Sequence, residues 1–96
     1  MHRFTAPLWV MEHTASVVFV TLPPDVSEDI RSQPREPRPG FGSLRVEVTC
    51  GSSVWRTSIF PSAGQRYYVL PVKKAVRLAE GIEVPDEVTF SITLLD

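Results

Sequence analysis

The sequence predicts a mainly β protein: one domain over residues 1–96 that forms a small six-stranded barrel with two short helices. Three observations predict this fold. Short stretches of alternating or β-branched residues recur along the chain. Prolines and glycines separate these stretches as turns. A strand–helix–strand unit occurs twice, which favours closure of two matching halves around each other.

The first two strands are predicted at 4–10 and 16–22, because both segments are rich in aromatic and β-branched residues. The stretch between them is short and largely polar, so we expect a hairpin that turns near Glu12–Ala15. Pro7 lies inside the first strand, where a proline is tolerated at an edge or a bulge. Pro23-Pro24 ends the second strand, since proline has no N–H for a ladder.

A short helix is predicted at 25–33, with Asp25 or Ser27 as the capping residue. The acidic residues that follow would lie in the first turn, where the helix dipole favours them. The next stretch, 34–42, holds three prolines and two glycines in nine residues. This composition predicts a surface loop.

The central part of the chain is predicted as a second hairpin, with strands at 43–50 and 54–60 joined by Gly-Ser-Ser. The first of these strands alternates apolar and polar residues, which is the period of a half-buried strand. Its apolar positions are Leu44, Val46, Val48 and Cys50.

The C-terminal third is predicted as a strand at 67–70, a helix at 72–80 and a strand at 87–95. Apolar residues in the helix recur at i, i+3, i+4 and i+7. Pro71 suits the first helical position and Gly81 supplies a left-handed ending. The last strand alternates, with core-facing positions at Val88, Phe90, Ile92 and Leu94.

An internal repeat relates the two halves of the chain. Each half runs from a strand ending in Leu-Pro, through a helix, to an alternating strand. Leu22-Pro23 and Leu70-Pro71 lie 48 positions apart, half of the 96 residues. One half has too small an apolar face to be stable alone. We therefore predict a pseudo-two-fold barrel in which each half covers the strand edges of the other.

Five segments resemble a bacterial family, domain of unknown function 1905. They read FTAPLW, FVTLP, GFGSLRVEVT, WRTSIFP and YYVLPVKKAVRLAEGIEVPDEVTFSI, and they occur in this order over nearly the whole chain. The resemblance implies a double-split β-barrel, related in shape to the swapped-hairpin barrels of the AbrB/MazE type, and no established activity. The chain departs from the family at Pro85-Asp86, where members have Gly-Asp. Proline fixes φ at about −65° and so excludes a left-handed turn there.

The composition is ordinary for a soluble globular domain, with 43% hydrophobic and 22% charged residues. The single cysteine, Cys50, allows neither an internal disulfide nor a cysteine-based zinc site. The N-terminal segment lacks the uninterrupted apolar run of a signal peptide, and no segment approaches the roughly 20 apolar residues of a membrane span. We therefore predict a cytoplasmic protein without membrane contact, present as a monomer or weak homodimer.

No catalytic, metal or cofactor site is predicted. His2 lies near the N-terminus and His13 in the first hairpin turn, and neither has a carboxylate or nucleophile partner nearby in the sequence. Cys50 lies on the apolar side of its strand, where a buried thiol is unreactive. Zinc needs at least three converging ligands, which two isolated histidines do not supply. These features predict a protein that is not an enzyme.

Basic residues gather in the middle of the chain. Nine lie between Arg31 and Arg77 against two acidic residues, which gives that segment a charge of +7, although the whole chain carries −1. Such a segment can form one binding face. The simpler interpretation is that folding disperses this charge, since a sheet interleaves distant segments.

Lys73 and Lys74 fall at the start of the helix predicted at 72–80, where the dipole opposes each cation by about 0.3–1 kcal/mol. Backbone N–H groups at a helix start attract anions, so these lysines can complete a site for a small anion or for an acidic group of a protein partner. Alternatively, they simply extend into water. The candidate binding residues are Arg56, Ser58, Arg66, Lys73, Lys74 and Arg77.

The alternative function is DNA binding, which the resemblance to AbrB-like barrels suggests. The basic middle segment supports it, whereas the net charge of −1 opposes it, because duplex binding needs several cations aligned on phosphates. The sequence therefore favours a binding module for a small anion or a protein partner, with nucleic acid as the less favoured ligand.

Overall fold

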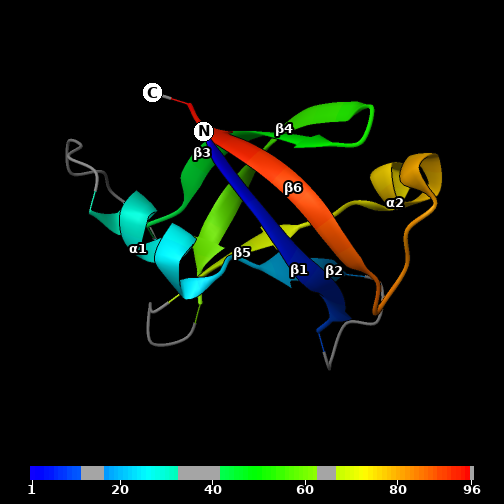
Figure 1. Cartoon of the computed structure of the whole chain (residues 1–96), viewed down its shortest axis with the longest axis horizontal. Helices are drawn as coiled ribbons and strands as arrows, with labels where there is room; N and C mark the ends of the chain where they lie inside the picture. The colour runs from blue at the N-terminus through cyan, green and yellow to red at the C-terminus, as the bar shows by residue number, and fades with distance from the viewer. Residues whose placement is uncertain (12–16, 33–41, 63–66, 96) are drawn as a thin grey trace.

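A computed structural model describes residues 1–11, 17–32, 42–62 and 67–95 (Figure 1). Six antiparallel strands close into a barrel in the order β1-β2-β5-β4-β3-β6. The strands are β1 (His2–Val10), β2 (Val18–Thr21), β3 (Leu44–Cys50), β4 (Ser53–Pro61), β5 (Tyr68–Pro71) and β6 (Glu87–Leu94), and the helices are α1 (Pro24–Arg31) and α2 (Lys74–Glu80). The prediction of a mainly β, six-stranded barrel with two short helices is confirmed.

The pairing of the strands has the two-fold symmetry that the internal repeat predicts. Exchanging β1 with β4, β2 with β5 and β3 with β6 leaves every pairing in the barrel unchanged. Where the halves meet, Thr21 pairs with Val69 and Val46 pairs with Leu94. The members of both pairs lie 48 positions apart, the offset between the two Leu-Pro steps. Where two equivalent strands pair across a two-fold axis, a residue pairs with its own equivalent in the other half.

One strand in each half changes its partner along its length. β4 pairs with β3 over residues 53–59 but with β5 only over 60–61. β1 likewise pairs with β6 over 2–7 and with β2 over 8–10. Residues 53–59 of β4 and residues 2–7 of β1 each have a second edge, and no described strand pairs with that edge. Figure 1 shows α1 and α2 at opposite ends of the molecule, and α2 packs on β4.

The core fills the barrel, and the alternation of β3 and β6 supplies much of it. All four predicted apolar residues of β3 are buried. In β6, Phe90 and Ile92 are fully buried, while Val88 and Leu94 are partly buried against the core. The predicted inward faces of both strands are therefore confirmed. They were predictable because apolar and polar residues alternate with a period of two in a strand that has one face in solvent.

The predicted caps of α1 are wrong. The helix runs over Pro24–Arg31 instead of 25–33, and Pro23 is its N-cap without any side-chain cap hydrogen bond. Proline at the first helical position needs no hydrogen bond and has a suitable φ, so the helix begins before Asp25. Ser27 lies inside the helix and is fully buried.

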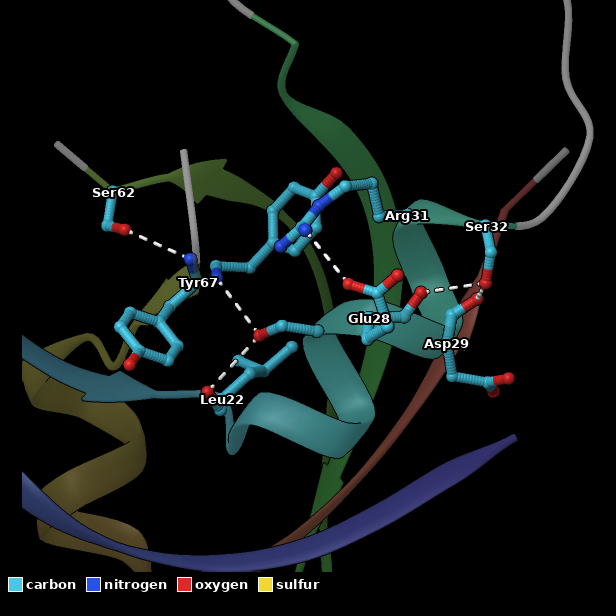
Figure 2. A network of polar contacts seen from close by, with 9 residues as sticks. Leu22, Glu28, Asp29, Arg31, Ser32, Ser62 and Tyr67 are labelled. Atoms are coloured by element: carbon cyan, nitrogen blue, oxygen red, sulfur yellow. Dashed lines mark hydrogen bonds and ion pairs between the residues drawn. The ribbon is translucent and has the colours of Figure 1, made fainter. Parts of the chain in front are cut away.

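Ser27 ties α1 to two strands of the barrel. Its Oγ donates to Leu22 O at the end of β2 and accepts the backbone N–H of Tyr68 in β5, both at 3.2 Å. Figure 2 shows the polar contacts of α1, among them the exposed ion pair between Glu28 and Arg31, which is 2.9 Å long. The buried hydroxyl thus pairs two backbone groups where α1 meets the sheet. A side chain without both a donor and an acceptor would leave at least one of these groups unpaired.

The start of α2 also differs from the prediction. The helix begins at Lys74 and Lys73 is its N-cap, whereas Pro71 belongs to β5 and pairs with Phe19 of β2. The N–H of Val72 still donates to Val18 O at 2.8 Å. These contacts with β2 hold the chain extended for two residues longer than the apolar periodicity suggests.

No helix in the described ranges is long and apolar enough to cross a membrane.

Candidate functional site

A pocket of about 360 Å³ lies beside the unpaired edge of β4, between this strand and the start of α2. It is lined by Val17, Val18, Trp55, Arg56, Thr57, Pro71, Val72, Lys73, Lys74 and Arg77. We call it the basic pocket, because four of these ten residues are cationic and none of them is acidic. Its volume falls within the range of roughly 300–1,000 Å³ typical of ligand sites.

The structure brings together four of the six predicted candidate residues. Lys73 and Lys74 come from the extended N-cap and the first position of α2. Arg77 follows Lys74 by three positions, which places the two side chains on one face of the helix. Arg56 comes from β4. The four cations therefore meet because the β5–α2 segment lies against the edge of β4.

The other two candidates do not join them among the described residues. Ser58 lies on β4, is half-buried and pairs with Arg45 of β3. It is not among the residues that line the basic pocket. Arg66 lies outside the described residues.

The cations differ in how firmly they are held. Arg56 Nε lies 3.4 Å from Glu47 Oε2 on β3, and both side chains are exposed. Such surface pairs contribute about 0–1 kcal/mol, so a ligand can displace Glu47. Arg77 uses its Nε–H to donate to Val72 O at 3.1 Å, which orients the guanidinium. Within the described ranges, neither Lys73 nor Lys74 forms an ion pair.

The helix start contributes less to this pocket than the sequence predicts. The N–H groups of Val76 and Arg77 both donate to Lys73 O, at 3.1 and 3.2 Å. These two donors are therefore occupied within the helix. α2 has only seven residues, so any attraction for an anion comes from the side chains.

Trp55 of β4 is one of the apolar residues that line the pocket. Its side chain is 8% exposed, and its indole Nε1 is buried. Among the described residues, this nitrogen has no hydrogen-bond acceptor. No sequence pattern singled out Trp55, which lines the same pocket as the lysines.

Glu80 is a further residue that sequence reasoning missed. At the last position of α2, its Oε2 accepts hydrogen bonds from Ser53 Oγ at 2.5 Å and from Ser52 Oγ at 3.3 Å. Its Oε1 occupies the space where a Cβ on Gly51 would lie. Figure 1 shows α2 beside the turn that joins β3 and β4. Glu80 thus fastens the helix that carries the lysines to the hairpin that carries Trp55 and Arg56.

These contacts change the ionisation of two groups. The hydrogen bond from Ser53 lowers the pKa of Glu80, because it stabilises the charged carboxylate. Burial raises the pKa of the Cys50 thiol, and the negative charge of Glu80 raises it further. Cys50 therefore stays a neutral thiol, which is a poor nucleophile and a poor metal ligand.

A second pocket, of about 370 Å³, lies at the corresponding place in the first half, between the start of β1 and α1. It is lined by Met1, His2, Arg3, Asp25, Val26 and Asp29. Its helix contributes two carboxylates where α2 contributes three cations. His2 Nδ1 lies 3.3 Å from Asp29 Oδ2, so one carboxylate already has a partner.

An apolar groove of about 410 Å³ follows β1, β2, β4 and β5. Trp9 and Phe19 stack in it with ring centroids 5.2 Å apart, and none of the described residues that line it is charged. Within the described part of the chain, no group of three His, Cys, Asp or Glu could hold a metal ion. The basic pocket is therefore the strongest candidate site for a charged ligand.

Two comparisons with known proteins complete this description. The family model described as domain of unknown function (DUF1905) matches residues 4–92, which include both helices and most of the barrel. Among curated proteins, no sequence matches the chain.

Proposed function

Since the chain belongs to the DUF1905 family, whose description names no activity, we propose a function from the basic pocket: the protein is a non-enzymatic binding module for a small anion. The observation that carries the proposal is the lining of this pocket, to which the described residues contribute four cations and no acidic residue. Like charges gathered in one pocket repel each other, and an anion bound among them offsets this repulsion because it attracts each cation.

The four cations suit different parts of this task. Lys73 and Lys74 are point charges that can move toward an anion, and neither is engaged by a described acidic residue. Arg77 is already oriented by its bond to Val72 O, which leaves its terminal nitrogens for a paired contact with a carboxylate or phosphate. Arg56 can turn from Glu47 toward the ligand because their surface pair is weak.

The same contacts suit an acidic side chain of a protein partner, which the sequence already suggested. They suit a DNA duplex less well, because duplex phosphates form an extended line. Four of the described cations converge on one pocket, whereas Arg31 lies in the other half of the barrel, paired with Glu28. The small anion is therefore the favoured ligand.

Thermal unfolding in increasing phosphate or sulfate tests the proposal. At ten times its Kd, a ligand stabilises the folded state by about 1.4 kcal/mol, or roughly 5–10 °C for a domain of this size. We expect this shift in the wild type and a much smaller one in Lys73→Ala/Lys74→Ala. The matched control is Arg3→Ala/Arg45→Ala, which removes two exposed cations outside the basic pocket. It should keep the wild-type shift.

Equal shifts in the wild type and both double variants would show a general salt effect and would refute the pocket. Titration with a DNA duplex separates the alternative function. Tight binding that weakens steeply with salt, without any response to phosphate, would favour nucleic acid instead.

A further inference from the structure

The open edge of β4 carries backbone groups that no described residue uses. In an antiparallel ladder, the N–H and C=O groups of successive residues point to opposite sides of the strand. Ser62 N–H donates to Tyr67 O, and Phe60 continues the same ladder, so Phe60 directs its backbone groups toward β5. Ser58 and Arg56, at alternate positions before it, direct theirs to the same side, where β5 no longer pairs with β4. Within the described ranges, these groups have no hydrogen-bond partner.

The open edge of β1 is protected against pairing with a further strand. Leu8 N–H donates to Asp86 O on the β6 side, so Thr5 and Pro7 direct their backbone groups to the open side. A proline at an outward position removes one donor, which is a common way to block an edge strand. Residues 53–59 of β4 include no proline. The open edge beside the basic pocket therefore keeps the donors that an added strand needs.

The basic pocket runs along this edge of β4. Trp55, Arg56 and Thr57 are consecutive residues of the strand, and all of them line the pocket. Since consecutive side chains point to opposite faces of a sheet, a space that contacts all three lies at the strand edge. The next hydrogen-bonded pair of the β4–β5 ladder would join Ser58 to Pro71, which has no N–H and lines the same pocket. The pocket thus opens where the two strands separate.

The floor and the rim of this pocket differ in polarity. Buried apolar residues form the floor: Val18, Trp55 and Val72. Exposed cations form the rim: Arg56, Lys73 and Lys74. A strand that lies along the edge of β4 presents alternate side chains to the two sides. Apolar side chains suit the floor, and acidic side chains suit the rim.

Building on the proposed anion-binding function, we infer that the anionic groups are presented by an extended acidic segment of a protein partner, which adds to the open edge of β4 as a further strand. Its backbone pairs with Arg56 and Ser58. Its acidic side chains contact the cations of the rim, and the apolar residues between them lie on the floor. In such strand addition, main-chain hydrogen bonds supply affinity and alternate side chains supply specificity. A free anion uses the same cations but not the edge.

Amide hydrogen exchange of the wild type tests the pairing directly. The probe is a peptide of alternating glutamate and valine, about nine residues long, with both ends blocked. At ten times its Kd it leaves about one protein molecule in eleven unbound, so the amides of Arg56 and Ser58 should exchange roughly tenfold more slowly. The amide of Thr5, at the open edge of β1, should be unchanged.

Two modified peptides test the same pairing from the side of the ligand. One carries N-methyl groups on its glutamates and the other on its valines. Alternate residues of an added strand direct their N–H groups toward β4, so only one of these two sets of donors is needed. In calorimetric titrations at constant ionic strength, one methylated peptide should therefore bind at least about tenfold more weakly than the other.

Ser58→Pro separates the edge from the charges. Ser58 directs its N–H away from β3, so proline removes the outward donor and leaves the ladder with β3 intact. The alternating peptide should bind at least about tenfold more weakly. Stabilisation by phosphate should stay as in the wild type, because Ser58 does not line the basic pocket. Thr5→Pro is the matched control at the open edge of β1, and it should keep both responses.

The outcomes separate this inference from the proposed function. Unchanged exchange at Arg56 and Ser58, or equal affinities of the two methylated peptides, would overturn strand addition and leave anion binding intact. Absence of both peptide binding and stabilisation by phosphate would refute the proposed function itself. Sedimentation that shows dimers of the wild type without peptide, and monomers of Ser58→Pro, would assign the edge to a second copy of the chain and overturn the acidic partner. The exchange measurement does not depend on the folding of Ser58→Pro.

Discussion

The two helices occupy corresponding places in the barrel, but their polar groups are used differently. α1 carries a fully buried serine that bonds to Leu22 and to β5, and three of its four charged residues have a partner: Glu28 pairs with Arg31, and Asp29 with His2. α2 buries only Val76 and leaves Lys73 and Lys74 without a described ionic partner. The symmetric topology therefore carries one helix that stabilises the barrel and one that supplies charge to a pocket.

The comparison shows how a repeated fold can divide its tasks. The ladder pairings are the same in both halves, because closing the barrel requires them. Side chains beside the unpaired strand edges are under no such constraint. The charged pocket residues from the helix side are acidic next to β1 and basic next to β4. Three substitutions test whether stability and binding are divided in this way, beginning with the largest expected effect.

Of the three substitutions, Ser27→Ala should reduce the stability of the protein most, because Ser27 anchors α1 to the barrel. It removes the hydroxyl that accepts the Tyr68 N–H and donates to Leu22 O, so two buried backbone groups lose their partner. We expect the free energy of unfolding in urea to fall by about 1–3 kcal/mol. Ser32→Ala is the control, because this exposed hydroxyl bonds only to carbonyls of its own helix. It should change stability by no more than about 0.5 kcal/mol.

Gly51→Ala should disturb the contact between α2 and the β3–β4 turn. Gly51 has φ +59° and Gly81 has φ +64°, so alanine at either position is strained by about 1–2 kcal/mol. A Cβ at Gly51 would also collide with Glu80, whereas one at Gly81 meets nothing within 4 Å. Urea unfolding should therefore show a larger loss for Gly51→Ala than for Gly81→Ala. In a Glu80→Ala background this excess should vanish; if it persists, Glu80 does not hold the turn.

Glu80→Gln should have the smallest effect, and that effect should depend on pH. The folded-state pKa of Glu80 is lowered, so its carboxylate stabilises the protein above the ordinary glutamate pKa of about 4.3. This contribution is lost as the pH falls through the lowered pKa. The stability difference between wild type and Glu80→Gln should therefore be present at pH 7 and shrink below pH about 4. A difference that is constant from pH 7 to pH 3 would contradict the role of the charge.

Local patterns predicted the strands well. The alternation of β3 identified every buried residue of that strand, and the spacing between Leu22-Pro23 and Leu70-Pro71 anticipated the symmetric pairing of the halves. Helix boundaries were harder to predict. Pro71 suits a helix start, but its pairing with Phe19 keeps it in β5. Asp25 and Ser27 suit a cap, but Pro23 and Pro24 begin the helix earlier.

The candidate site was only partly predictable. The basic middle segment and the two lysines suggested a set of candidate residues, of which Arg56, Lys73, Lys74 and Arg77 line one pocket. Folding nevertheless divides the basic segment, because Arg31 pairs with Glu28 on α1. The contact of Glu80 with Ser53 joins residues that are 27 positions apart. No local pattern marks such a contact.

The sequence by itself determined the strands, their inward faces and the repetition of the strand–helix–strand unit, because each of these depends on the spacing of apolar residues along a short segment. Only the tertiary structure decided that β4 stops pairing with β5 at Phe60, leaving an open edge for α2 to cover. It also decided that four cations share one pocket with Trp55. The register of distant strands sets both features, and a one-residue change of register reverses the face of every side chain.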